Sequence, residues 1–231
     1  MKIAFDKINM RRLPVVFLVT LTLLSCSKWD DFKKYTADGE ILYTGRLDSI
    51  SVFSGMNRIR ITGKLNADPK IVALKIFWNN KADSVAYEIK RSNGAFFDQT
   101  FTVAEGVRTF TIFTYDAEGN SSVPVTVTGV SYGDSYRRTI NNRLISSITY
   151  VAATDSTTIN WDAIDVKTAL HTELKYPKNP DGDSVTVITS ATNARTGLKG
   201  FNYQTSKFTY RTIYRPDSTS IDTFATQYIV R

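Results

Sequence analysis

Cysteine and histidine each occur once in this 231-residue chain, as Cys26 and His171. A single cysteine cannot form a disulfide within the chain, so the fold must depend on its hydrophobic core. One histidine and one cysteine are too few for a zinc site built from these ligands. A Ser-His-Asp triad would have to use His171, and no Gly-x-Ser-x-Gly turn precedes it. The sequence therefore predicts no metal, no cofactor and no catalytic residue.

The chain also lacks an apolar run long enough to span a bilayer, which takes about 20 residues. The run Leu13–Leu24 has about the length of a signal h-region and follows the basic segment Met1–Arg12. Leu23-Leu24-Ser25-Cys26 then resembles a lipobox, in which the cysteine thiol is acylated and the chain is cut before it. We predict a signal peptide over residues 1–25 and a lipid on Cys26. The alternative is an ordinary secretory signal with an incidental cysteine.

The positive charge belongs partly to this leader. Residues 1–25 hold four basic residues and one acidic residue, so their removal takes +3 from the net charge of +7 and leaves +4. No basic cluster is denser than Tyr136-Arg137-Arg138, so we expect no nucleic-acid partner. Asp30 and Asp31 after the cysteine resemble the surface-export signal of Bacteroidetes lipoproteins. That resemblance implies an outer-membrane protein facing the cell exterior, with a plain solvated tether as the alternative.

The rest of the chain has the pattern of an all-β protein. Threonine, valine, isoleucine and aromatic residues alternate in short runs that are broken by Gly, Asn, Asp and Pro. Seven strands are predicted in the first half, a pattern typical of an immunoglobulin-like sandwich: Ser49–Phe53, Arg58–Leu65, Val72–Trp78, Ser84–Lys90, Phe97–Val103, Arg108–Tyr115 and Val123–Val130. The second half repeats this plan with Ile145–Val151, Thr157–Trp161, Thr172–Tyr176, Ser184–Thr189, Ala194–Leu198, Lys207–Tyr214 and Thr223–Val230.

These strands divide the chain into two sandwiches. We predict a lipid-anchored tether over residues 26–40, a first sandwich over 41–133, a linker over 134–142 and a second sandwich over 143–231.

Four stretches of the second half resemble a fibronectin type III module, among them Glu173–Tyr176 as its C strand and Thr196–Gly200 as the turn ahead of its F strand. Thr158-Ile159-Asn160-Trp161 is similar to its B strand, where a tryptophan closes one end of the core, and Phe208–Tyr214 is similar to its F strand. About four extra residues between Leu198 and Phe208 depart from the family pattern. In the first half, Gly63 stands where that tryptophan is expected, and Trp78 is the candidate to fill the space. The resemblance implies two tandem fibronectin type III or immunoglobulin-like sandwiches.

A resemblance also extends over the whole mature chain. Asp38-Gly39-Glu40, Asn57-Arg58, Asp68-Pro69 and Ile76-Phe77-Trp78-Asn79-Asn80 are similar to a family of Bacteroidetes surface lipoproteins of unassigned function. That family has two such domains and is associated with polysaccharide-uptake systems. The resemblance implies an outer-membrane transporter complex or a polysaccharide as partner, and it carries no mechanism.

Paired acids were considered as catalytic or metal-binding groups. Asp162 and Asp165 follow a predicted strand and are expected to cap a turn, whereas Asp181-Gly182-Asp183 has the composition of a hairpin turn. Asn179, Asp181 and Asp183 could alternatively ligate calcium through oxygen atoms, although a bidentate glutamate at suitable spacing is missing.

Aromatic residues in loops are the candidates for ligand binding, because sugar rings stack on aromatic faces. Most of the 13 Phe, 12 Tyr and 3 Trp residues must serve the core of a sandwich without disulfides. Tyr176, Tyr203 and Phe96 are the preferred ligand-binding candidates, ahead of Trp29, Phe32, Tyr132 and Tyr136. For each of them the alternative is domain packing or scattered exposure.

Two functions remain open from the sequence. One is a non-catalytic surface lipoprotein that captures glycans as an accessory of polysaccharide uptake. The other is a structural or protein-interaction spacer with no glycan affinity, in which an exposed edge strand pairs with a partner. Fold alone does not decide between them.

Overall fold

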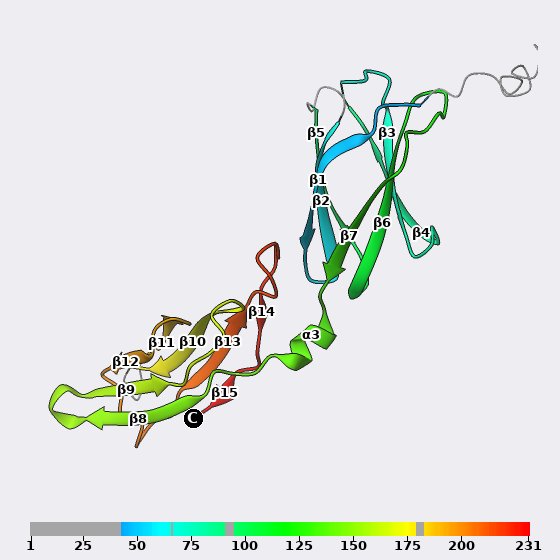
Figure 1. Ribbon diagram of the computed structural model, residues 1–231. Coiled ribbons are helices and arrows are strands. Elements are labelled where there is room, and N and C mark those ends of the chain that lie inside the picture. The colour runs from blue at the N-terminus through cyan, green and yellow to red at the C-terminus, as the bar shows by residue number, and fades with distance from the viewer. Residues whose placement is uncertain (1–42, 66, 91–94, 179–182) are drawn as a thin grey trace, which may run out of the picture. The chain divides into compact units, whose positions relative to one another are not determined.

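The computed structural model describes residues 43–65, 67–90, 95–178 and 183–231 (Figure 1). Packing separates the chain into Met1–Leu42 and Tyr43–Arg231, and the description concerns the second unit. The predicted signal peptide, Cys26, the whole predicted tether with Trp29 and Phe32, and Asn179 and Asp181 of the calcium alternative lie outside the described residues. In the described part of the chain, no helix has the length and apolarity needed to cross a membrane.

The first half of this unit is a sandwich of two antiparallel sheets. Its strands are β1 (Leu47–Ser54), β2 (Arg58–Leu65), β3 (Ala73–Trp78), β4 (Asp83–Glu88), β5 (Phe96–Thr102), β6 (Gly106–Tyr115) and β7 (Val125–Ser131). One sheet has the order β1-β2-β5 and the other β4-β3-β6-β7. Three strands facing four in this order is the plan of a fibronectin type III module.

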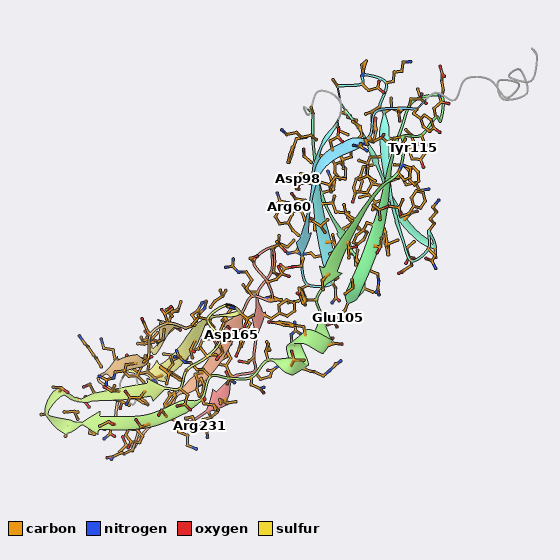
Figure 2. The ribbon with its side chains drawn as sticks, viewed as in Figure 1. Arg60, Asp98, Glu105, Tyr115, Asp165 and Arg231 are labelled. Atoms are coloured by element: carbon orange, nitrogen blue, oxygen red, sulfur yellow. The ribbon has the colours of Figure 1, made fainter. Side chains whose placement is uncertain are left out.

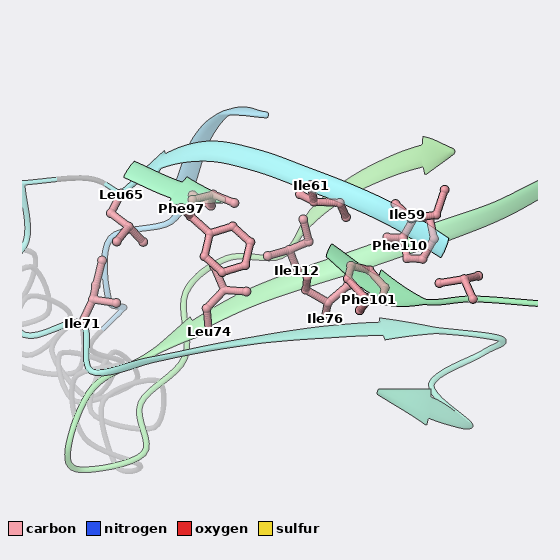
Figure 3. Close-up of a cluster of buried hydrophobic side chains, with 12 residues drawn as sticks. Ile59, Ile61, Leu65, Ile71, Leu74, Ile76, Phe97, Phe101, Phe110 and Ile112 are labelled. Carbon is pink, nitrogen blue, oxygen red and sulfur yellow. The ribbon is translucent and has the colours of Figure 1, made fainter. Parts of the chain in front are cut away.

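The core of the first sandwich follows from the alternation of side chains along each strand. Ile59 and Ile61 of β2 face inward from one sheet, and Phe110 and Ile112 of β6 face inward from the other, with at most 1% exposure. Figure 3 shows these side chains together with those of β3 and β5. Burying such large side chains supplies the main stabilising term for a sandwich without disulfides.

Gly63 is accommodated differently from the sequence-based expectation. A Cβ atom at this position would lie 2.8 Å from Cγ of Leu47, so it is the Leu47 side chain that occupies the space beside the glycine. Trp78 packs instead against Phe101 and Phe110, with ring centroids 5.4 and 6.1 Å away. The prediction that Trp78 fills the space at Gly63 is wrong, because Leu47 of the neighbouring strand β1 fills it.

The second half repeats the plan. Its strands are β8 (Ile145–Val151), β9 (Ser156–Trp161), β10 (Ala169–Pro177), β11 (Ser184–Ser190), β12 (Arg195–Lys199), β13 (Thr209–Tyr214), β14 (Phe224–Ala225) and β15 (Ile229–Val230), with a 3-10 turn, η2 (Ala152–Thr154), between β8 and β9. One sheet is β12-β9-β8; the other is β11-β10-β13-β14, with β15 also pairing with β13. Trp161 closes the core as expected, at 5% exposure and 5.3 Å from the Tyr210 ring.

The last predicted strand is interrupted by Thr226. Its hydroxyl accepts the hydrogen bond of the Thr212 N–H at 2.8 Å, while the Thr226 N–H donates to the Thr212 carbonyl at 3.0 Å. A side-chain oxygen therefore takes the place of a backbone carbonyl in the ladder. The predicted strand Thr223–Val230 is consequently two short strands, β14 and β15.

The segment predicted as a linker contains a helix, α3 (Asp134–Thr139). The Glu105 carboxylate accepts hydrogen bonds from the backbone N–H groups of Ser135 and Tyr136, at 2.8 and 2.9 Å (Figure 2). These bonds satisfy N–H groups that the first turn of a helix leaves without a partner. Hydrogen bonds from Ser135 and its neighbours outweigh desolvation and lower the pKa of Glu105. The capping group lies 30 residues away in the chain, so the local sequence carries no cap signal.

Candidate functional site

Tyr176 is a core residue. Its side chain is 5% exposed, its ring centroid lies 5.2 Å from that of Phe201, and its hydroxyl reaches the Lys199 carbonyl at 3.5 Å. The ring therefore has no free face on which a sugar could stack, which corrects the sequence-based preference for this residue. Its predicted place at the end of a strand beside Pro177 is close to the observed one, since β10 ends at that proline, but the strand end is covered.

Tyr203 lies on the extra loop that departs from the fibronectin pattern. The loop turns back onto the core, because Phe201 and Phe208 on either side of it are buried to 2% exposure or less. The Tyr203 N–H donates to the Thr157 hydroxyl at 3.3 Å, and its half-buried ring packs against the second core. The inserted residues thus cover the end of the second sandwich, and one side of the Tyr203 ring is buried against its core.

Among the predicted ligand-binding residues that the structure describes, Phe96 has a largely free ring, at 56% exposure. It borders a hollow of about 250 Å³ where β4 and β5 lie at the open edge of the first sandwich. The hollow is lined by apolar rings and by polar side chains suited to hydroxyl groups: Leu65, Tyr87, Glu88, Ile89, Lys90, Phe96, Phe97, Asp98 and Gln99. Phe96 therefore stays a candidate.

The aromatic residues near the predicted linker form a cluster with β14. Tyr132 and Tyr136 lie 5.1 Å apart, and the Phe224 ring lies 6.3 Å from the first and 5.0 Å from the second, all edge to face. Such pairs add about 0.5–1.5 kcal/mol each beyond the area they bury. The alternative interpretation of Tyr132 and Tyr136, packing between the two halves, is the one that the geometry supports.

Polar contacts extend this cluster. We call the whole set the junction: Ser54, Met56, Arg58, Tyr132, Tyr136, Asp217, Ile221, Asp222 and Phe224. The loop between β13 and β14 places Asp222 against the first half, where its carboxylate accepts hydrogen bonds from the Met56 N–H at 2.7 Å and the Arg58 Nε at 2.8 Å. The Ile221 N–H donates to the Ser54 carbonyl at 2.8 Å. At Gly55 a Cβ atom would lie 2.8 Å from an Asp222 oxygen, so the close approach requires glycine there.

Asp217 is the second carboxylate of the junction. It accepts a hydrogen bond from the Ser54 hydroxyl at 2.8 Å. Burial would raise its pKa, but hydrogen bonds from Thr219, Ser54 and Tyr132 outweigh burial and lower it. Burial, and next the contact with Asp217, raise the pKa of Tyr132 to about 12. Both groups thus keep their ordinary charge at neutral pH, with the phenol as donor and the carboxylate as acceptor.

Sequence reasoning missed the junction residues. Ser54 and Asp217 lie 163 positions apart, and Arg58 and Asp222 lie 164 apart. No spacing rule connects positions so distant. The one local signal is the polar composition of the segment from Arg215 to Asp222, between two predicted strands.

His171 belongs to a cluster of polar and charged side chains around the Glu173 carboxylate. His171 Nε2 is 3.6 Å from Glu173, whose other oxygen accepts hydrogen bonds from Arg211 at 2.6 Å and the Tyr228 hydroxyl at 3.2 Å. Desolvation by itself would raise the pKa of Glu173. The hydrogen bond and charge of Arg211, with hydrogen bonds from Tyr228 and His171, outweigh desolvation and lower this pKa. A carboxylate held ionised in this way is a poor general acid. The arrangement resembles a structural ion-pair network more than a catalytic centre.

Of the paired acids, Asp165 is used by its own turn. Asp165 accepts hydrogen bonds from the Lys167 N–H at 3.0 Å and the Thr168 hydroxyl at 3.2 Å, so it caps its own turn as expected. Across the described ranges, no group of three His, Cys, Asp or Glu side chains is placed to hold a metal ion.

Comparison with known proteins places the chain in a family. Residues 26–224 match the model of DUF4998, a domain of unknown function. The chain belongs to the DUF4998 family. No curated protein matches it. For this DUF4998 protein, the lipoprotein character and the link to polysaccharide uptake stay predictions.

Solved structures similar to this DUF4998 protein are tandem fibronectin type III segments. A two-domain segment of chicken tenascin aligns over 80% of this chain and 97% of its own, at 13% identity and a TM-score of 0.31. The FN1–FN3 domains of chicken CNTN1 align over 82% of this chain and 68% of their own, at 9% identity and a TM-score of 0.38. The fold assignment itself stands on the strand order of the two sandwiches.

Proposed function

We propose that this protein is a non-catalytic structural and interaction module that a lipid on Cys26 holds at the outer-membrane surface, facing the cell exterior. The junction is the observation that supports a spacer role. Tandem domains move relative to each other by default unless their interface is large or well bonded. Here two carboxylates, a bridging backbone bond and three aromatic rings connect the halves, a set of contacts that resists such motion.

The anchor is proposed from the leader sequence and the residue types around Cys26. A thioether to diacylglycerol requires a thiol, and Cys26 is the sole cysteine of the chain. Two acyl chains provide stable membrane attachment, because each buried CH₂ contributes about 0.8 kcal/mol. A lipid anchor on one end and a stiff pair of sandwiches beyond it would hold a binding surface at a set distance from the membrane.

Replacing Cys26 with alanine is expected to release the protein from membranes. When cells that express the full-length chain are fractionated, the Cys26→Ala variant should be found in the soluble or secreted fraction, whereas the wild type should be found in the membrane pellet. Ser27→Ala, next to the cysteine, serves as the control and should leave the protein in the pellet. A Cys26→Ala variant that pellets as the wild type does would contradict the anchor. A separate experiment, cross-linking of the wild type in intact cells, would show whether a transporter complex is the partner.

Glycan capture is the second candidate function, and the free ring of Phe96 beside its hollow is the observation that favours it. If sugars stack there, Phe96→Ala should weaken binding of a polysaccharide found in a broad glycan screen by about tenfold, since loss of about 1.4 kcal/mol gives that factor. Tyr43→Ala, which removes another exposed ring at 62% exposure, is the matched control and should have no effect. Equal weakening by both variants would argue against a site at Phe96.

A further inference from the structure

The outward face of β3 and β6 carries aromatic rings that the core does not use. Along β6 the side chains of Phe110, Ile112 and Thr114 point inward, which places Phe113 and Tyr115 on the opposite face. Phe77 lies on the same outer face of β3, and Lys75 of that strand pairs directly with Phe113. We call the set Lys75, Phe77, Lys81, Phe113 and Tyr115 the outer patch.

The rings of the outer patch contact one another in a row. The Phe77 and Phe113 centroids are 5.9 Å apart at 85°, and the Phe113 and Tyr115 centroids are 6.4 Å apart. All three are half-buried, and none belongs to the buried core cluster of the first sandwich. Three aromatic residues on the solvent face of a rigid sheet are more than random exposure of single residues accounts for.

Two lysines lie over these rings without an acidic partner. Lys75 Nζ is 4.8 Å from the Phe77 centroid, and Lys81 Nζ is 5.4 Å from the Phe113 centroid. Neither ammonium forms an ion pair with any carboxylate among the described side chains. Arg60 and Arg211, which also lie over rings, pair with Asp98 and Glu173, whereas Lys175 over Tyr228 likewise forms no ion pair within the described ranges.

The turn between β3 and β4 holds Lys81 beside the sheet at a conformational cost. Asn79, Asn80 and Lys81 have φ of 48°, 53° and 67°, in the left-handed region that a lysine rarely adopts. Consecutive positive φ values are typical of a tight hairpin turn such as this one. The turn places the Lys81 ammonium over the Phe113 ring.

A hollow of about 310 Å³ lies beside the rings. Its lining combines an aromatic face, an amide, an ammonium and two hydroxyls, from Phe77, Trp78, Asn80, Lys81, Thr109 and Thr111. An aromatic platform fits the apolar face of a sugar ring, the amide and hydroxyls fit sugar hydroxyl groups, and unpaired ammoniums fit an acidic substituent.

We propose that the outer patch and the hollow beside it bind an acidic polysaccharide, with a sugar ring in the hollow and its carboxylate or sulfate group on Lys75 and Lys81. A protein partner fits less well, because a stable protein interface buries about 800 Å² on each side and an added peptide strand pairs with a sheet edge rather than a face. The proposal deepens the proposed interaction role, on which it rests, by naming a surface and a partner class. It is independent of the Phe96 hollow.

The test measures binding of the full-length chain, in a neutral detergent, to four immobilised polymers: polygalacturonate, dextran sulfate, uncharged dextran and polyglutamate. We expect binding to polygalacturonate or to dextran sulfate, and the polymer that binds more strongly identifies the acidic group as carboxylate or sulfate. Binding to dextran and to polyglutamate should be at least tenfold weaker. The double variant Lys75→Gln/Lys81→Gln should lose about tenfold in affinity, since two exposed ion pairs contribute about 0.2–1 kcal/mol each. Phe77→Leu/Phe113→Leu, which keeps the apolar volume, should also bind more weakly.

The matched control is Lys167→Gln/Lys199→Gln, which removes the same charge from exposed positions of the second half. It should bind as the wild type does. The proposal is overturned if no acidic polysaccharide binds, if polyglutamate or dextran binds equally well, or if the control loses as much affinity as the patch variant. Thermal melting of each variant shows whether lost binding reflects lost folding. Absence of polysaccharide binding would leave the result of the Cys26→Ala fractionation unchanged. The acidic-polysaccharide proposal and the lipid-anchor proposal can therefore fail separately.

Discussion

Replacing Trp161 with alanine should lower the free energy of unfolding of the second half by about 3–5 kcal/mol. The indole is 5% exposed, packs against Tyr210, and donates from Nε1 to the Thr196 hydroxyl at 2.8 Å. Its removal leaves a large cavity and takes the donor away from a buried hydroxyl. Domains of this size are stable by about 5–15 kcal/mol, so the loss is a large part of the total.

Trp161 also covers a buried guanidinium, which adds to the expected loss. Arg143 is 4% exposed and lies 5.8 Å from the indole, and it donates to the carbonyls of Asp162 and Asn193 at 2.8 and 3.0 Å. Urea denaturation followed by circular dichroism measures the change. Trp161→Phe is the control and should lose markedly less, because most of the apolar volume stays. Equal stability of Trp161→Ala and wild type would show that the indole does not close this core.

Asp222→Ala should loosen the junction and lower the free energy of unfolding by about 1–3 kcal/mol. The Met56 N–H and the Arg58 guanidinium both lose their acceptor. The Arg58 side chain is 47% exposed, so most of the loss is expected from the backbone N–H rather than from the ion pair. Nitrogen-15 relaxation of the two halves should then report different correlation times, where the wild type gives one.

Asp98→Ala is the matched control for this prediction. It breaks the Arg60–Asp98 pair, which has similar geometry but lies within the first sandwich with both side chains 39% exposed (Figure 2). We expect a cost of about 1 kcal/mol or less and unchanged correlation times. Relaxation data that do not distinguish Asp222→Ala from Asp98→Ala would contradict a role for the junction in coupling the halves.

The pH dependence provides a second check on Asp222. The hydrogen bond from Arg58 is the largest cause that lowers the pKa of this carboxyl. A group whose pKa is depressed by folding contributes stability above its unfolded pKa, about 3.9 for aspartate, and that stability is lost as the pH falls through the folded pKa. The stability difference between wild type and Asp222→Ala should therefore shrink below about pH 4.

Much of the fold could be predicted from the sequence. Arg58–Leu65 and Ile145–Val151 were predicted with the observed bounds, and most other strands within two or three residues. Alternation of apolar and polar residues reports a strand locally, because successive side chains point to opposite faces. The resemblance to a fibronectin type III B strand identified Trp161 as a core residue.

The candidate site could be predicted far less well. Tyr176 and Phe96 both stand at a strand end beside turn residues, yet one is 5% and the other 56% exposed. Composition cannot separate them, since the difference depends on Phe201, which a distant loop folds over Tyr176. The outer patch was likewise missed, because strand pairing between β3 and β6 is what brings Lys75 and Phe113 together.

The sequence by itself determined the all-β character, the two repeats of a sandwich and the lipid-anchor prediction at Cys26, because each depends on residues that are neighbours in the chain. Tertiary structure decided what holds the halves together and which aromatic rings are free. The Glu105 cap of α3, the Asp222 contact with Met56 and Arg58, and the row of rings on β3 and β6 all join residues that are remote in the sequence. Such contacts form when strands pair and loops close, and no local pattern encodes them.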